Sequence, residues 1–210
     1  MKNPIITLHM NNGKQIKLEL YVNVAPNTVS SIITTALAGQ YNGSEFYRVI
    51  KDFVLQTGCS EHDNYNMYSS YRIKGEFKAN NFLIEQPKFR RGIVGMGGIE
   101  PKSSNKTSFF IMTSDLKDRP QKRKSLDDNY AAIGKVIEGL EEVMRINELA
   151  THNLTYNGID FNTPKIPQII EKVVVETFGQ PYLEPSAVEY GLETKAKIAA
   201  MGKLLKTIKN

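Results

Sequence analysis

The stretch that decides the fold is Phe46-Tyr47-Arg48-Val49-Ile50-Lys51-Asp52-Phe53-Val54-Leu55-Gln56-Thr57-Gly58. Its two apolar runs predict short strands near residues 46–50 and 53–56. Arg48 and Gln56 are long polar side chains inside these runs. A single arginine in a strand is more often a surface or ion-paired residue, and a glutamine often only satisfies a backbone group. Taken one at a time, these two residues therefore indicate no function.

On the amino-terminal side of this stretch, a hairpin is predicted around Asn12-Gly13. Apolar and polar residues alternate before this pair, over residues 6–10, and after it, over residues 16–20. Alternation of period two on both sides of an Asn-Gly pair is a strong hairpin signal. Both residues tolerate positive φ, so we expect a type I′ turn.

The remaining elements predict a mainly β fold. A helix is expected to begin at Pro26 and to end near Gly39, and a second helix is expected over residues 140–149. The apolar face of the first helix consists of Val29, Ile32, Ile33 and Leu37. Further strands are predicted over residues 92–96, 108–113, 131–136 and 168–178. Many short strands with only two helices favour an antiparallel β-barrel.

The composition changes after Gly179. Pro181 and Pro185 mark a linker, and residues 189–209 predict a helix. Its apolar residues, spaced by three and four, are Ile198, Met201, Leu205 and Ile208. We therefore expect a main domain over residues 1–178, followed by a linker and helix over residues 179–210. An isolated helix is marginal in water, so it should dock onto the barrel, or onto a second chain and pair two protomers; the alternative is a frayed, mobile tail.

Composition excludes several function classes. The chain has 210 residues, a net charge of +5 and a single cysteine, Cys59, so neither an intramolecular disulfide nor a cysteine zinc site can form. This cysteine content suits a reducing compartment, and we expect a cytoplasmic protein. His9, His62 and His152 are too scattered to predict a metal site. No apolar run predicts a membrane span, and the dispersed lysines predict no specific nucleic-acid partner.

Five segments, in order from about residue 5 to residue 178, resemble the cyclophilin family of peptidyl-prolyl cis-trans isomerases. They are residues 25–28, 41–44, 46–58, 92–111 and 126–139. The resemblance implies a closed antiparallel β-barrel capped by two helices, with the helix after residue 179 as an extension. It also implies cofactor-free, non-covalent acceleration of rotation about X-Pro bonds in unfolded or flexible chains, which assists folding. Expected partners are therefore proline-containing peptides and unfolded proteins.

The chemistry of this reaction gives the matching residues their expected roles. Rotation of an X-Pro bond needs a dry site for the proline ring and a fixed donor near the twisted amide. Arg48 can be that donor, and Gln56 can hold both Arg48 and the substrate backbone. The resemblance implies an apolar substrate pocket of Phe53, Val54, Met96, Phe110, Leu126 and Tyr130. Since this pocket ends at Tyr130, removal of the tail should leave most of the activity.

The sequence departs from the family at several positions. Lys51-Asp52 replaces a common Pro-Gly, Gly97-Gly98 replaces an Ala-Asn, and Ser108 replaces a Gln. Ser125 stands where many members have a tryptophan associated with cyclosporin, so cyclosporin is expected to bind weakly. The stretch 114–125 is expected to be a long loop, and its basic run, residues 117–124, is either a solvated loop or an electropositive border of the groove.

A second function class remains open. The same pocket could belong to a proline-peptide binding module or chaperone whose turnover is weak or irrelevant. The presence of Arg48 together with Phe53, Gln56 and Phe110 favours the enzyme, because binding a proline ring does not by itself require an arginine. Turnover of a short X-Pro peptide distinguishes the two.

Overall fold

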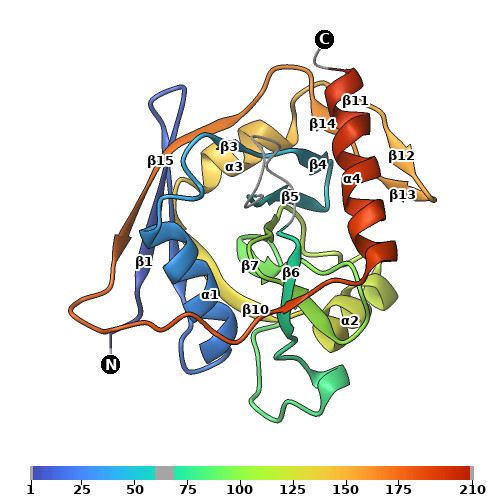
Figure 1. Cartoon of the computed structure of the whole chain (residues 1–210). Coiled ribbons are helices and arrows are strands. Elements are labelled where there is room, and N and C mark those ends of the chain that lie inside the picture. The colour runs from blue at the N-terminus through green and yellow to red at the C-terminus, as the bar shows by residue number, and fades with distance from the viewer. Residues whose placement is uncertain (1, 60–68, 209–210) are drawn as a thin grey trace.

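Figure 1 shows a computed structural model of the chain, which describes residues 2–59 and 69–208. The strands of its main sheet are β1 (Ile5–Met10), β2 (Gln15–Leu20), β3 (Ser44–Glu45), β4 (Arg48–Ile50), β5 (Val54–Thr57), β7 (Ile93–Met96), β9 (Phe109–Met112), β10 (Ala132–Glu138) and β15 (Ile169–Glu176). Their spatial order is β3-β15-β1-β2-β10-β7-β9-β5-β4, with all pairs antiparallel. The prediction of a mainly β, antiparallel architecture is confirmed.

The sequence predicts a closed barrel, but the main sheet formed by residues 2–59 and 69–208 does not close. Within the described residues, the two end strands β3 and β4 pair with β15 and β5 and not with each other. The sheet is therefore a curled half-barrel. Its concave side encloses the larger core, to which α1 (Pro26–Leu37) contributes Val29 and Ile33 and α3 (Leu140–Asn147) contributes Val143 and Ile146. Two helices thus cover this core, as predicted.

Helix α1 begins at Pro26, as predicted, and Gly39 follows its end with a φ of +70°. Its predicted apolar face is buried, except that Leu37 is 59% exposed. The first turn is capped from far along the chain, because both carboxylate oxygens of Glu76 accept hydrogen bonds there. The donors are the backbone N–H groups of Asn27 (3.2 Å) and Thr28 (2.8 Å).

The β1–β2 hairpin is present, but its turn differs from the predicted type I′. Gly13 has a φ of +79°, whereas Asn12 has no positive φ. The Gly13 N–H donates to the Met10 carbonyl, and the Met10 N–H donates to the Lys14 carbonyl, both at 2.9 Å. One left-handed glycine after a turn is the pattern of a slightly longer hairpin loop.

Smaller elements lie outside the main sheet. One small sheet consists of β6 (Tyr71–Lys74), β8 (Ser103–Asn105) and β16 (Val188–Glu189). Two further sheets have two strands each. One pairs β11 (Thr151–His152) with β14 (Thr163–Pro164), and the other pairs β12 (Thr155–Tyr156) with β13 (Ile159–Asp160). A short 3-10 turn, η1, covers Lys78–Asn80.

Helix α2 (Pro120–Asn129) was not predicted, since its stretch was expected to be a loop. Of its ten residues only Leu126 is buried, so no apolar stripe marked it as a helix.

The tail docks on the body of the same chain, which is one of the expected outcomes. Helix α4 (Leu192–Thr207) lies beside β12 and β13 in Figure 1. Its buried residues Met201 and Leu205 pack on Tyr47 and Phe161, with Ile198 and Ile208 at the edge of this cluster. None of the helices in the described part of the chain is both long and apolar enough to cross a membrane.

Candidate functional site

A row of residues across four strands forms the base of the site. Arg48 on β4 lies opposite Gln56 on β5, Gln56 opposite Phe110 on β9, and Phe110 opposite Gly95 on β7. Residues directly opposite one another in a sheet project from the same face. The strand pairing therefore brings Arg48, Gln56 and Phe110 together on the convex side of the sheet, away from the larger core.

Met96 is the exception among the expected pocket residues. Side chains alternate between the two faces of a strand. Since Gly95 faces the convex side, its neighbours Val94 and Met96 face the concave side, where both are buried in the larger core at 0% exposure. The prediction that Met96 contacts substrate is therefore corrected, because it is a core residue.

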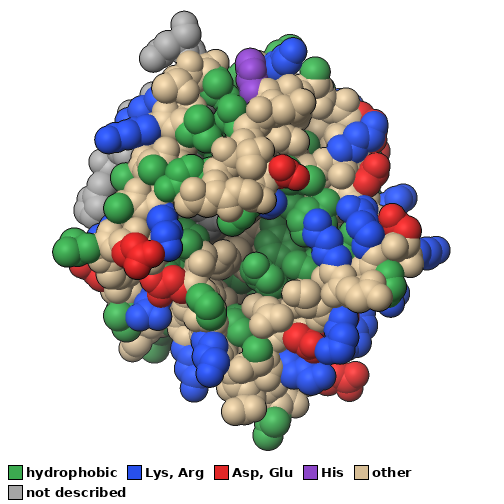
Figure 2. All heavy atoms as spheres, turned by 90° about the vertical axis from the view of Figure 1, so that its right-hand side faces the viewer, with side chains coloured by type: hydrophobic (Ala, Val, Ile, Leu, Met, Phe, Trp, Pro, Cys, Tyr) green, Lys and Arg blue, Asp and Glu red, His purple; other side chains and the backbone are tan. Residues whose placement is uncertain are grey.

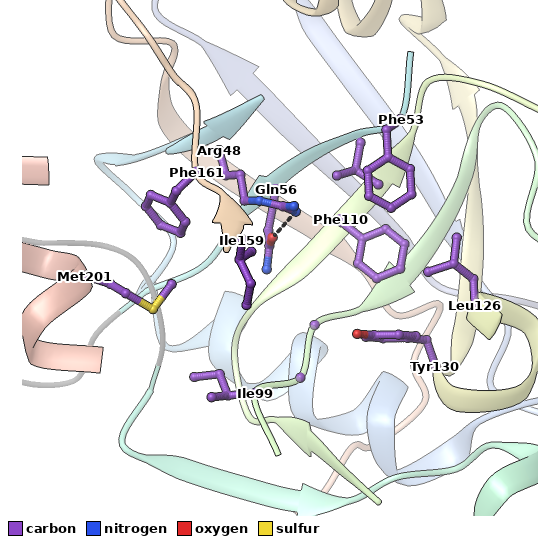
Figure 3. Close-up of a pocket in the computed structure, with 13 residues that line it drawn as sticks. Arg48, Phe53, Gln56, Ile99, Phe110, Leu126, Tyr130, Ile159, Phe161 and Met201 are labelled. Atoms are coloured by element: carbon purple, nitrogen blue, oxygen red, sulfur yellow. Dashed lines mark hydrogen bonds between the residues drawn. The ribbon is translucent and has the colours of Figure 1, made fainter. Parts of the chain in front are cut away.

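A chain of hydrogen bonds fixes the polar part of the site, and Figure 3 shows its Arg48–Gln56 bond. One terminal nitrogen of Arg48, Nη1, donates to Oε1 of Gln56 at 3.1 Å, and Nε of Arg48 donates to the Asp160 carbonyl at 2.8 Å. Nε2 of Gln56 donates to the Ser108 hydroxyl at 3.0 Å, which also lies 3.0 Å from the Tyr47 hydroxyl. Ser108, although shorter than the family's glutamine, thus anchors Gln56, and Gln56 anchors Arg48.

The apolar part of the site is a cluster of aromatic and aliphatic side chains. It contains Phe53, Val54, Phe110 and Leu126, with Tyr130 packed at its edge. The rings of Phe110 and Tyr130 meet edge to face, with centroids 5.8 Å apart. On the other side, Phe110 stacks on Phe89 at 5.5 Å. Such packing gives a rigid surface suited to a small aliphatic ring.

Gly95 allows these rings to lie close to the sheet. A Cβ atom at Gly95 would come within 2.4 Å of Cζ of Phe110 and within 2.6 Å of Cε1 of Phe89. Real Cβ atoms do not approach other atoms so closely, so any side chain here would displace both rings. The glycine in the 92–96 segment is therefore a requirement of the pocket on the convex face.

The turn before Phe53 keeps its form despite the Lys51-Asp52 departure. Asp52 has a φ of +53°, a left-handed conformation that Asp and Asn tolerate better than most residues. Its N–H donates to Oδ1 of Asn147 at 3.0 Å, and the Phe53 N–H donates to the Ile50 carbonyl at 3.0 Å. The tight turn thus carries Phe53 onto the pocket without the family's usual glycine.

The site is a single cavity of about 270 Å³. Seven of the eight expected site residues line it: Arg48, Phe53, Val54, Gln56, Phe110, Leu126 and Tyr130. The sequence analysis missed Gly97, Gly98, Ile99, Ile159, Phe161 and Met201, which also line it. The expectation that the pocket ends at Tyr130 is therefore wrong. The spacing of Met201 from Ile198 and Leu205 indicates that one face of their helix is buried, but it does not indicate that this face borders the site.

Cationic groups lie beside the cavity, and Figure 2 shows Lys and Arg side chains along one side of an apolar hollow. Nζ of Lys122, on α2, lies 3.6 Å from the centroid of the Phe53 ring. Arg119, whose charge acts on Lys122, donates from Nη2 to the Asp52 carbonyl at 2.6 Å. Partial burial lowers the pKa of Lys122, and the nearby charges of Arg119 and Arg48 lower it further.

Two other lysines of the basic run lie beside acidic residues. Lys124 pairs with Asp128, and Lys117 lies 4.0 Å from Asp115. Arg119 also lies 3.4 Å from Asp118, so among these cations Lys122 is the one placed over a ring that lines the cavity. Within residues 2–59 and 69–208, no three His, Cys, Asp or Glu side chains are grouped closely enough to hold a metal ion; His62 lies outside these residues.

The arrangement can therefore do one kind of chemistry directly. It presents a positioned guanidinium beside an apolar pocket, so it can bind a ring and donate hydrogen bonds to an adjacent polar group. Two of the five guanidinium N–H groups of Arg48 are used by Gln56 and Asp160. Within the part of the chain that the structure describes, the other three make no hydrogen bond.

Comparison with known proteins gives one consistent result. Residues 5–175 match the family model described as cyclophilin type peptidyl-prolyl cis-trans isomerase/CLD. Peptidyl-prolyl cis-trans isomerase 10 of Caenorhabditis elegans is 34% identical over 148 residues, which cover 70% of this chain and 84% of that protein. A peptidyl-prolyl cis-trans isomerase of Acinetobacter baylyi is 32% identical over 179 residues, or 85% of this chain and 89% of that protein.

Solved structures agree on the fold. A cyclophilin type peptidyl-prolyl cis-trans isomerase of Cryptosporidium parvum superposes with a TM-score of 0.63 at 24% identity, covering 85% of this chain and 99% of that one. The same protein in the presence of the dipeptide Ala-Pro also gives a TM-score of 0.63.

Proposed function

This chain belongs to the cyclophilin-type peptidyl-prolyl cis-trans isomerases, and from this premise we propose that its convex-face cavity is the active site. The proline ring of an X-Pro segment lies against Phe53, Phe110 and Leu126 while the preceding amide bond rotates. The observation that carries this proposal is the Arg48–Gln56 hydrogen bond of 3.1 Å beside that apolar cluster.

Arg48 acts by stabilising the twisted amide. The barrier to rotation is about 18–20 kcal/mol, because resonance holds the peptide unit planar. A hydrogen bond to the prolyl nitrogen, or to a neighbouring carbonyl as it turns, opposes that resonance. Because Gln56 and the Asp160 carbonyl already orient the guanidinium, little reorganisation is needed as the bond twists. No covalent intermediate is required.

The test of this proposal is turnover of a short Ala-Pro peptide followed by NMR exchange spectroscopy. The uncatalysed isomerisation takes tens to hundreds of seconds. A catalytic amount of the protein should bring exchange between the cis and trans signals to the millisecond-to-second range. Peptide resonances that shift on binding without any acceleration of exchange would instead identify a proline-peptide binding module.

The proposal extends to the substrates of the activity and to its location in the cell. Substrates are exposed X-Pro bonds in unfolded or flexible chains, where the isomerase assists folding. The protein acts in the cytoplasm, a location supported by the single cysteine of the chain, Cys59, which suits a reducing compartment.

Peptides that carry an acidic residue beside the X-Pro bond should be turned over faster than matched basic peptides. Lys122 lies over the Phe53 ring and Arg119 lies nearby, and an anion beside the cavity offsets the repulsion between these cations. We expect kcat/KM to be about threefold to tenfold higher for a Glu-flanked than for a Lys-flanked peptide at low salt. The difference should shrink at 0.5 M salt, because exposed charges are screened.

Two charge variants test the assignment of that preference. Lys122→Gln should reduce it, whereas Lys117→Gln should not, since Lys122 lies over the Phe53 ring of the cavity and Lys117 lies beside Asp115. Equal kcat/KM values for the two peptides at low salt would leave the basic run with only a solvation role.

Cyclosporin should bind more weakly than it binds family members that carry tryptophan at the position of Ser125. Ser125 is exposed on α2 and does not line the cavity, so it supplies neither an aromatic surface nor an indole N–H. Isothermal titration calorimetry measures this directly. Dissociation constants in the nanomolar range would contradict the expectation, and Ser125→Trp should tighten binding.

A further inference from the structure

The cavity continues beyond Arg48 and Gln56 to a second apolar surface. This surface, the distal wall, consists of Ile99, Ile159, Phe161 and Met201. In Figure 3 the distal wall lies on one side of the Arg48–Gln56 pair, and Phe53, Phe110 and Leu126 lie on the other. The two surfaces border the same cavity, so a bound peptide can contact both at once.

The distal wall is held in place by its own packing. Phe161 is 1% exposed and stacks on Tyr47, with ring centroids 5.7 Å apart. Met201 is 8% exposed and packs with Phe161 and Leu205. These contacts fix the position of Met201 at the cavity, while Ile159, at 56% exposure, is accessible to a ligand.

Helix α4 is also tied to the segment that follows β7. The Thr194 hydroxyl donates to Oε1 of Glu100, and Oε2 of Glu100 lies 3.2 Å from Nη1 of Arg72. Glu100 directly follows Ile99, which belongs to the distal wall. The polar contacts therefore set the helix and the 97–100 segment at a fixed spacing on this side of the cavity.

We propose that the distal wall is a subsite for an apolar side chain of the substrate, on the amino-terminal side of the proline and within two residues of it. The inference rests on the proposed function, which places the proline ring against Phe53 and the prolyl nitrogen at Arg48. The chain that leaves this nitrogen away from the ring is the residue X and its predecessor. Two extended residues span about 7 Å, which leads past Arg48 toward the distal wall.

The distal wall depends on a segment outside the family match. That match ends at residue 175, whereas Met201 lies on α4. The tail thus adds Met201 to a wall whose other residues, Ile99, Ile159 and Phe161, lie within the matched part of the chain. A methionine has a flexible, polarizable side chain, so it can adapt to leucine, isoleucine or phenylalanine in the substrate.

The experiment uses two pairs of peptides. The first pair differs only in the residue directly before proline, which is Leu or Ala. The second pair differs only in the residue one position earlier, which is again Leu or Ala. The unmodified protein should give a kcat/KM about threefold to tenfold higher for Leu at one of these positions, because each buried methylene contributes about fourfold. In Met201→Ala that ratio should fall at least threefold. Lys203→Ala, on the exposed side of α4, is the matched control and should leave the ratio unchanged.

A third variant separates the side chain from the docking of the helix. Leu205 packs in the same cluster but does not line the cavity, so Leu205→Ala loosens α4 without removing the wall residue. A loss of the Leu preference in Leu205→Ala as large as in Met201→Ala would overturn the assignment to Met201. An equal kcat/KM for Leu and Ala peptides in the unmodified protein would overturn the subsite.

A binding measurement keeps the inference distinct from the proposed function. With ¹³C-labelled methionine methyl groups, titration of the Leu-Pro peptide should shift the Met201 signal, and the Ala-Pro peptide should shift it less. Absence of turnover for every peptide, with the Met201 shift retained, would refute the proposed isomerase activity and support the subsite. Turnover without any shift of Met201 would support the activity and refute the subsite.

Discussion

Arg48→Ala should lower kcat/KM for X-Pro peptides by about 30- to 1000-fold, which corresponds to about 2–4 kcal/mol of lost transition-state stabilisation. The guanidinium is oriented by Gln56 and by the Asp160 carbonyl, and it borders the cavity without belonging to any of the three hydrophobic clusters of the described residues. Its removal should therefore affect the reaction far more than the fold. Exchange spectroscopy gives the rate, and thermal unfolding followed by circular dichroism gives the stability.

Two further variants sharpen this prediction. Arg48→Lys keeps the positive charge but loses the planar arrangement of donors, so it should recover only a small part of the activity. Lys51→Ala removes a cation from the adjacent turn; Lys51 pairs with Glu148 at the surface and does not line the cavity, so activity should be unchanged. Normal turnover by a folded Arg48→Ala protein would exclude the proposed mechanism.

Removal of residues 180–210 should lower the melting temperature by about 5–15 °C. Met201 and Leu205 are buried against Tyr47 and Phe161, and burial of each side chain is worth about 1.5–3 kcal/mol before the entropy of ordering the tail is subtracted. A net loss of about 2–4 kcal/mol lowers the melting temperature of a chain of this size by about 2–4 °C per kcal/mol. Differential scanning calorimetry measures the shift.

A pair of point variants tests the same prediction without truncation. Leu205→Asp introduces a charge into the buried cluster and should reproduce much of the destabilisation, whereas Lys203→Asp changes an exposed position of the same helix and should not. If the truncated protein melts at an unchanged temperature, and amide exchange finds α4 unprotected in the full chain, the docking contributes nothing to stability.

The sequence by itself determined the elements whose signals are local. The alternation around Asn12-Gly13 specified the β1–β2 hairpin, although the conformation of its turn differed. The stretch from residue 46 to residue 58 specified β4, β5 and the turn between them. Antiparallel pairing then puts Arg48 opposite Gln56. Both residues could thus be identified together, because their separation along the chain is short and the connecting turn is tight.

Local patterns were insufficient where an element carries little apolar surface or where the facing direction matters. Helix α2 buries only Leu126, so its polar sequence predicts a loop. Met96 belongs to a fully buried strand, in which both faces are apolar and the alternation that distinguishes them is absent. Only the pairing of β7 with β9, which places Gly95 opposite Phe110, shows that Met96 faces the concave core.

Tertiary structure alone decided which distant segments meet. Glu76 caps the first turn of α1 although 48 residues separate it from Thr28, and Ile159, Phe161 and Met201 reach a cavity whose other residues end at Tyr130. The heptad-like spacing of α4 required a buried face but was equally compatible with a second chain as its partner. The physical reason is that burial of apolar surface is not directional. A sequence can specify that a face must be covered, but the path of the folded chain determines what covers it.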